Sequence, residues 1–279
     1  MKILGLIIVV LVGAVLEYAT IDFPPLGDPA SPASTHVSPR YIEKSIEETA
    51  VPNVVTSVLA DYRGFDTMFE TTVIFSAGVA CFLLLRVPPS RRPQRASERQ
   101  YRHRLTGLTF RIKGGAEVSL PLHEFERVDS IWTPYDFIIE KVCRYLIPFI
   151  QLFGLYVIAH GHHSPGGGFQ GGVILGASII LLSVSHNLRI ALKRMGERTS
   201  ALFSPVGVFI YAGTGALCLI LGYNFLDYQA LAALLPGGPI MARSHGIFIV
   251  EVGVGMAVMG TMVWIFKNLA SLGRYDEGL

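Results

Sequence analysis

Charged side chains are scarce in this sequence. Asp, Glu, Lys and Arg make up 16% of the 279 residues, and hydrophobic residues make up 51%. Soluble domains carry about 25% charged residues, because their surfaces face water. The shortage of charge therefore argues against a soluble protein and indicates an integral membrane protein.

Cysteine is also rare, and its spacing is not that of a metal site. Cys81, Cys143 and Cys218 lie in or beside apolar segments, and no two of them form a CxxC pair. This pattern indicates neither a disulfide framework nor an iron–sulfur or zinc site. The sequence also shows no ligand pattern for a redox cofactor and no nucleophile–base pair. We therefore expect a chain that holds no cofactor and is not an enzyme by itself.

Long apolar runs are abundant instead. About 20 apolar residues cross a bilayer core as a helix. We predict an all-α integral membrane protein with about six transmembrane helices. The first run also fits a signal peptide, but the Leu16–Ala19 region is a poor cleavage site, so we expect a retained helix. The six predicted spans are 3–19, 67–87, 144–160, 169–188, 204–225 and 243–266.

Basic residues predict the orientation of these spans. When the spans alternate from a cytoplasmic Lys2, all but four of the Lys and Arg residues fall on the cytoplasmic side. The exceptions are Arg40, Lys44, Arg63 and Arg243. This distribution follows the positive-inside rule, so we expect a multi-pass protein with both termini in the cytoplasm.

The spans group into three predicted regions. Residues 1–88 form a two-helix module with an extracytoplasmic loop at 20–66. Residues 89–142 form a basic cytoplasmic connector, and residues 143–279 form a four-helix membrane domain.

Shorter elements are expected between the spans. Ser38-Pro39 predicts the start of a surface helix that runs to Thr49, and apolar residues recur at helical spacing after Pro52. In the connector we expect a short strand at 117–122 and an interfacial helix at 134–141. The basic part of the connector either binds anionic headgroups or an acidic partner, or is a solvated linker. It lacks the interleaved aromatic residues of a nucleic-acid site.

The first candidate site lies at the start of the second span. Arg63, Asp66 and Glu70 recur at the spacing of one helical face. A carboxylate just inside a membrane boundary is costly unless it is paired or hydrated, so Glu70 is a functional candidate. The alternative is a surface salt bridge between Arg63 and Asp66, with Glu70 facing headgroups.

A run rich in histidine and glycine separates the third and fourth spans. His160, His162 and His163 titrate near neutral pH and can pass protons. Zinc needs four ligands, or three and a water, and no fourth ligand is evident, so we expect no metal. The rest of the run predicts a tight turn that depends on glycine, formed by Pro165, Gly166, Gly167, Gly168, Gly171 and Gly172.

Glu251 is the strongest single-residue indication of ion or proton handling. It lies about eight residues inside the outer end of the last predicted span, which is about 12 Å at the rise of an α-helix. A glutamate at this depth must be protonated, paired or beside water. His245 lies near the entrance of the same span and is a further candidate. The alternative is a structural hydrogen bond from Glu251 to a neighbouring helix.

These motifs resemble two known families. The segment 54–85, with its Asp61-Tyr62-Arg63-x-Phe65-Asp66-Thr67-x-x-Glu70 core, resembles the E-type subunit of membrane-bound hydrogenases and the carboxy-terminal part of the large channel subunit in Mrp-type antiporters. Residues 146–266 resemble the MnhB-type subunit of those antiporters. The matching motifs are His160-Gly161-His162-x-Ser164-Pro165-Gly166-Gly167-Gly168-Phe169-Gln170-Gly171-Gly172 and Ser244-x-Gly246-x-x-x-x-Glu251-x-Gly253-Val254.

The resemblance implies an accessory subunit of a large prokaryotic membrane complex that exchanges Na⁺ for H⁺. It implies partners among other Mrp-type antiporter subunits, and hydrogenase or other iron–sulfur subunits if the complex is redox-driven. The first module stands apart from the large channel subunit that precedes it in a typical antiporter, which favours the redox-driven assembly. The alternatives are a stand-alone Mrp-type antiporter and a scaffold without ion conduction. The ion-path candidates are Asp66, Glu70, His160, His162, Glu251 and His245.

Overall fold

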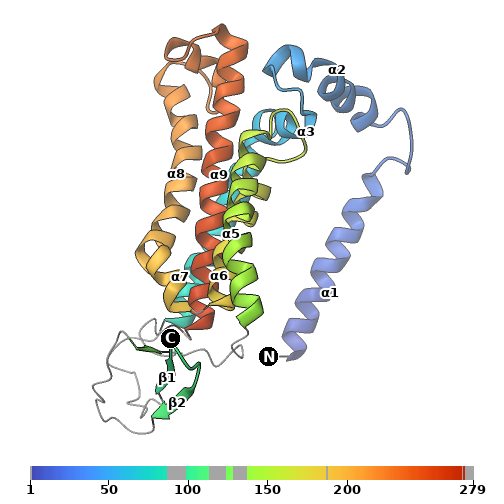
Figure 1. Ribbon diagram of the computed structural model, residues 1–279. Coiled ribbons are helices and arrows are strands. Elements are labelled where there is room, and N and C mark those ends of the chain that lie inside the picture. Colours follow the sequence, from blue (N-terminus) through green and yellow to red (C-terminus); the bar gives the residue numbers. More distant parts are fainter. Residues whose placement is uncertain are drawn as a thin grey trace. The chain divides into compact units, whose positions relative to one another are not determined.

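The computed structural model describes residues 2–86, 99–112, 124–127, 137–186, 188–271 and 273. Within these residues, six helices are long and apolar enough to cross a membrane (Figure 1), which confirms the predicted all-α membrane fold. The chain forms two compact units, Met1–Ser45 and Ile46–Leu279, which are described separately.

The first unit is mostly helical. Helix α1 (Lys2–Ala19) continues into a short 3-10 turn, η1 (Thr20–Asp22), and apolar residues cover every side of α1. A π-helical turn, η2 (Ala33–Val37), precedes helix α2 (Ser38–Thr49), whose last four residues belong to the other unit. The surface helix predicted from Ser38 to Thr49 is therefore confirmed.

The second unit is a helical bundle built around its last helix (Figure 1). Helix α9 packs against each of the other four long helices and is the most buried of the candidate spans. Glycines permit this close approach, because a Cβ atom added at Gly172 would lie 2.7 Å from the carbonyl oxygen of Gly255. The five helices are α4 (Gly64–Leu85), α5 (Phe137–Ala159), α6 (Gly168–Ser185), α8 (Glu197–Ile220) and α9 (Gly238–Ala270).

Three helices differ clearly in extent from the predicted spans, and the first of them, α5, begins at Phe137 instead of residue 144. The span predicted at 204–225 is α8, which begins and ends earlier in the sequence, and Gly222 adopts a φ of +87° just after its end. The span predicted at 243–266 is α9, which begins earlier, directly after Gly237 with its φ of +105°. Hydropathy marks the apolar centre of a helix, whereas backbone turns decide where the helix stops.

The connector contains a small sheet. Strands β1 (Arg99–His103), β2 (Thr109–Ile112) and β3 (Phe125–Arg127) pair antiparallel in the order β2-β1-β3. The strand predicted at 117–122 lies outside the described residues. The helix predicted at 134–141 is described from residue 137 onward, as the start of α5. A short helix, α7 (Leu188–Arg194), precedes α8.

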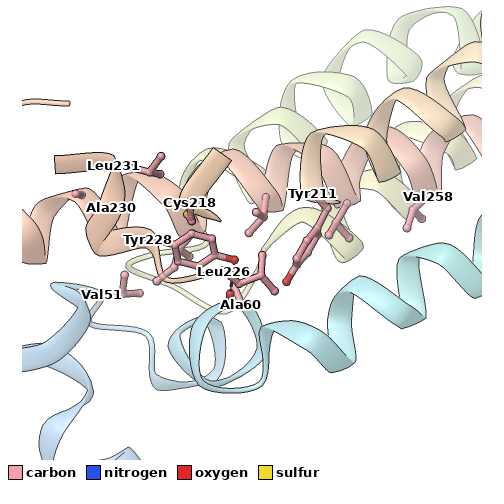
Figure 2. Packing of buried hydrophobic residues seen from close by; sticks show 13 residues of the cluster. Val51, Ala60, Tyr211, Cys218, Leu226, Tyr228, Ala230, Leu231 and Val258 are labelled. Carbon is pink, nitrogen blue, oxygen red and sulfur yellow. Dashed lines mark hydrogen bonds between the residues drawn. The ribbon is translucent and has the colours of Figure 1, made fainter. Parts of the chain in front are cut away.

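Short helices tie the first predicted module to the last two spans. Helix α3 (Val54–Ser57) and the π-helical turn η3 (Val58–Tyr62) lead into α4, and the 3-10 helix η5 (Tyr228–Ala233) precedes α9. Figure 2 shows Tyr228 directed at Ala60, whose carbonyl oxygen accepts a 2.9 Å hydrogen bond from the Tyr228 hydroxyl. Tyr211 on α8 makes the same contact with the carbonyl oxygen of Gly64, at 2.9 Å. Residues from both predicted membrane regions therefore share one core.

Candidate functional site

A cavity of about 280 Å³ brings together side chains that are far apart in the sequence. Glu70 of α4 and Glu251 of α9 both line it. The two carboxylates come from the two predicted membrane regions and share one partly apolar pocket. Other lining residues are Val55, Leu59, Thr67, Phe169, Gln170, Tyr211, Val250 and Val254.

Glu251 is buried, with 7% of its surface exposed. The backbone N–H of Gly168 donates a hydrogen bond to its carboxylate. Its Oε2 atom is fully buried and has no hydrogen-bond partner among the described residues. A buried carboxylate oxygen without a donor is costly, and such groups occur where a proton, an ion or water completes the site.

The glycine-rich turn lies directly against this carboxylate. Gly167 has a φ of +127°, a backbone conformation that residues with a side chain rarely adopt. A Cβ atom at Gly167 would also lie 2.7 Å from the Glu251 Oε1 atom. A Cβ atom on Gly168 would overlap the backbone carbonyl of Glu251. The sequence motif therefore lets backbone, instead of side chains, surround Glu251.

His162 is the histidine that approaches Glu251. It is 8% exposed, and its Nδ1 atom lies 3.7 Å from the Glu251 Oε2 atom. Its Nε2 atom lies 3.0 Å from the carbonyl oxygen of Ser244. A carbonyl oxygen only accepts, so Nε2 must carry a hydrogen and Nδ1 is the free position of the neutral ring.

The 3.7 Å contact between these two residues favours a proton on one of them. With neutral His162 and ionised Glu251, a lone pair would face a carboxylate oxygen in a buried site, which is unfavourable. A proton on either partner removes this repulsion. Burial lowers the pKa of His162, the contact with Ser244 opposes that change, and the charges of His163 and His245 lower the pKa further.

The loop that carries His162 is anchored by a residue that sequence reasoning missed. The Asn53 side-chain amide donates to the carbonyl oxygens of Gly161 (2.8 Å) and Ser164 (2.9 Å). The Asn53 backbone N–H donates to the carbonyl oxygen of His162 (2.9 Å). Thr56 adds a hydroxyl donor to Gly161 at 2.8 Å. The only local signal in the sequence is that Asn53 stands where a helix N-cap is expected.

The other candidate histidines lie away from Glu251. His160 is exposed and stacks on Tyr156, with ring centroids 4.2 Å apart. His163 is exposed as well, and His245 is half-buried on α9. Among the described residues, no group of three or more His, Cys, Asp or Glu side chains could hold a metal ion.

The acidic cluster at the start of α4 divides into two parts. Asp66 is exposed and accepts a 2.6 Å hydrogen bond from the Nε atom of Arg63, the residue before α4. The predicted surface salt bridge between these two residues is thus present. Glu70, one turn further along, lines the cavity.

A buried ion pair joins η3, just before α4, to the first turns of α9. Asp61 Oδ2 lies 2.7 Å from a guanidinium nitrogen of Arg243, and 6% of the Asp61 side chain is exposed. Burial raises the pKa of Asp61, and the hydrogen bond and charge of Arg243 oppose that rise. Beside this pair, the Tyr62 hydroxyl donates to Glu48 at 2.5 Å, and burial with this contact raises the pKa of Tyr62.

The remaining glycines of the motif serve packing. A Cβ atom on Gly166 would lie 2.8 Å from the carbonyl oxygen of Val157, and one on Gly171 would lie 2.8 Å from that of Gly154. Pro165 is exposed at the tip of the turn. These residues shape the turn and its packing, and the atoms nearest to Gly166 and Gly171 belong to α5 instead of Glu251.

Comparison with known families divides the chain in two. Residues 3–102 match the MbhE family model, which describes the E-type subunit of MBH. Residues 138–264 match the model for a domain related to the MnhB subunit of Na⁺/H⁺ antiporter. The two matched segments are those that contribute Glu70 and Glu251 to the cavity.

Two curated relatives show different coverage. A probable K⁺/H⁺ antiporter protein of Rhizobium meliloti (strain 1021), of the A/B subunit type, is 28% identical over 86% of this chain, which spans 22% of that relative's length. A putative antiporter subunit mnhB2 of Staphylococcus aureus (strain Newman) is 27% identical over 48% of this chain and 94% of its own length.

Two solved structures share the fold. A chain of the membrane-bound sulfane sulfur reductase, an archaeal respiratory membrane complex, aligns with a TM-score of 0.59 and 24% identity over 96% of this chain and 97% of its own. A chain of the Mrp complex from Dietzia sp. DQ12-45-1b aligns with a TM-score of 0.59 and 25% identity over 99% of this chain and 26% of its own.

Proposed function

We propose that this chain, which joins an MbhE-like region to an MnhB-like domain, is an accessory membrane subunit of a multisubunit antiporter module that exchanges Na⁺ or K⁺ for protons. The observation that carries the proposal is the cavity lined by Glu70 and Glu251. A buried ionisable group such as Glu251 is expensive in a membrane protein and marks an ion or proton path, and Glu70 lines the same cavity from an exposed position.

The pocket's part in this exchange is to hold and release a proton. Glu251 and His162 hold one proton between them, and Glu70 lines the same cavity with a second carboxylate. A proton that leaves the pair uncovers a negative charge, which favours entry of a cation into the pocket. Competition of this kind is the physical basis of exchange. The chain moves ions and catalyses no covalent step by itself.

We further propose that the module belongs to a redox-driven complex of the membrane-bound hydrogenase type. Near-complete mutual coverage with a chain of the sulfane sulfur reductase complex supports this, because the same two regions form a whole chain there. In the Dietzia Mrp complex they match about a quarter of a longer chain. The partners would be other Mrp-type antiporter subunits together with iron–sulfur redox subunits, in a prokaryotic cell membrane.

In the proposed orientation, both termini lie in the cytoplasm. The 160–167 turn and the Asp61–Arg243 pair then lie at the outer surface, and the basic connector lies inside. This orientation rests on the distribution of Lys and Arg along the sequence.

Transport assays on charge-neutral variants test the proposal. Glu70→Gln and Glu251→Gln, each in the complete complex in membrane vesicles, should lose most cation-dependent proton movement while the complex still assembles. Glu43→Gln, at an exposed position on α2, is the matched control and should behave as wild type. Wild-type transport in both cavity variants would remove the ion-path assignment.

The scaffold alternative gives a different pattern. If the two glutamates only tie helices together, the same variants should fail to assemble, and the small amount of complex that forms should transport normally. Transport is therefore expressed per assembled complex. A mild-detergent pull-down with mass spectrometry then identifies the partners: iron–sulfur subunits support the redox-driven complex, and antiporter subunits alone indicate a secondary antiporter.

A further inference from the structure

The geometry points to Asn53 as a positioning residue that holds His162 against Glu251, so that the MbhE-like region controls a proton site in the MnhB-like domain. This inference rests on the proposed function of the Glu251 site. It adds a residue from the other region of the chain, on the loop before α3, which touches neither Glu251 nor the imidazole ring.

Asn53 binds the backbone on both sides of His162. Its Nδ2 atom lies 2.8 Å from the carbonyl oxygen of Gly161 and 2.9 Å from that of Ser164. Its backbone N–H donates to the carbonyl oxygen of His162 itself. One residue thus fixes three carbonyl groups within four consecutive positions.

The orientation of the Asn53 amide follows from its partners. Its Oδ1 atom accepts a hydrogen bond from the backbone N–H of Val55 at 3.1 Å, which caps α3. The Nδ2 atom therefore faces the two carbonyl oxygens, which need donors. Serine or alanine at this position could not supply two N–H groups in a fork.

The three hydrogen bonds from Asn53, which we call the clamp, fix the distance between the His162 imidazole and the Glu251 carboxylate. The backbone of His162 is held by Asn53, and the Nε2 atom of its ring is held by the carbonyl oxygen of Ser244. With both ends fixed, the Nδ1 atom must face Glu251. Without the clamp, the turn is free to move away and admit water to the carboxylate.

Both consequences of releasing the clamp act in the same direction. A protonated Glu251 loses its nearby acceptor, and the ionised form gains hydration, so the pair takes up its proton only at lower pH. Other titratable groups face this site: His163 on the same turn, His245 on α9, Glu70 on α4 and Tyr211 on α8. None of them is altered by a substitution at Asn53.

The test compares the pH profile of transport among variants of the complete complex. Asn53→Ser keeps an oxygen that caps α3 and the backbone N–H that donates to His162, but it removes the amide that binds Gly161 and Ser164, and its profile should move to lower pH by about one unit. Thr56→Val, which removes one donor to Gly161, should give a smaller shift in the same direction, whereas Thr56→Ser should match wild type. Asn224→Ser, on an exposed loop, is the matched control.

The outcomes separate this inference from the proposed function. If Glu251→Gln abolishes transport but Asn53→Ser and Thr56→Val leave the pH profile unchanged, Asn53 has no positioning role and the ion path stands. If Glu251→Gln transports normally, the ion-path role of Glu251, on which this inference rests, is wrong. A lower rate at every pH with an unchanged midpoint would also overturn the inference, because a merely structural defect lowers the rate without moving the profile.

Discussion

The Nδ1 atom of His162 lies 3.7 Å from the Oε2 atom of Glu251, at the contact between the glycine-rich turn and α9. Because the other ring nitrogen is held by the carbonyl oxygen of Ser244, this contact places two acceptor atoms opposite each other, and one proton on either of them relieves their repulsion. The relationship turns a buried glutamate in an apolar helix into half of a proton-sharing pair.

His162 should make the stability of the protein depend on pH. Its pKa in the unfolded chain is near the ordinary value of 6.5, and burial lowers it in the folded protein. Below pH 6.5 the unfolded chain therefore binds a proton at this residue that the folded chain takes up only at lower pH, so the contribution of His162 to the free energy of unfolding falls as pH decreases from 6.5 toward the folded pKa. Thermal unfolding across this range measures the effect.

The control for this prediction is a side chain that cannot titrate. His162→Asn should have a flatter dependence of Tm on pH between 6.5 and 5 than wild type. A wild-type slope in this variant would show that another group, such as His163 or His245, causes the dependence.

Gly168 should tolerate no side chain. A Cβ atom there would overlap the backbone carbonyl of Glu251, and neither α6 nor α9 can move away without losing packing along its whole length. Overpacking of a core costs about 1–3 kcal/mol and sometimes more, so Gly168→Ala should lower Tm clearly and reduce the amount of assembled complex. Gly213→Ala on α8, where the nearest atoms lie at 3.8 Å, is the matched control. Equal behaviour of the two variants would contradict the close contact.

Breaking the Asp61–Arg243 pair should cost far more than breaking an exposed pair. Asp61→Asn leaves a half-buried Arg243 without its counter-charge, which typically costs about 3–5 kcal/mol. Asp66→Asn breaks the exposed contact with Arg63, worth below about 1 kcal/mol. Thermal unfolding of the two variants compares the costs directly.

A double variant distinguishes a paired charge from a general packing defect. Asp61→Asn combined with Arg243→Gln removes both charges and should recover much of the stability lost by Asp61→Asn alone. Additive losses in the double variant would mean that the two side chains do not stabilise one another.

The architecture and Glu251 were predictable from sequence because each depends on local chemistry. A run of apolar residues marks a span wherever the chain folds, and a carboxylate within such a run stands out by its solvation cost. The glycine motif predicted a tight turn for the same kind of reason. The spans and the burial of Glu251 are therefore confirmed, and its role in an ion path stays a prediction.

The clamp and the ion pair were not predictable, because each joins positions that the sequence separates widely. Asn53 is one polar residue in a polar loop, and nothing near it indicates that its amide binds carbonyl groups more than a hundred positions away. Asp61 and Arg243 lie 182 positions apart in the sequence. Similarly, composition could not tell His162 from His160, since only the fold decides which ring faces Glu251.

The most direct measurement is infrared difference spectroscopy on the purified complex across a pH titration. We expect a protonated carboxyl signal that disappears in Glu251→Gln and shifts in His162→Asn, because the proton belongs to the pair. The absence of any carboxyl signal that depends on Glu251 would mean that this glutamate never takes up a proton, which would contradict a proton site at Glu251.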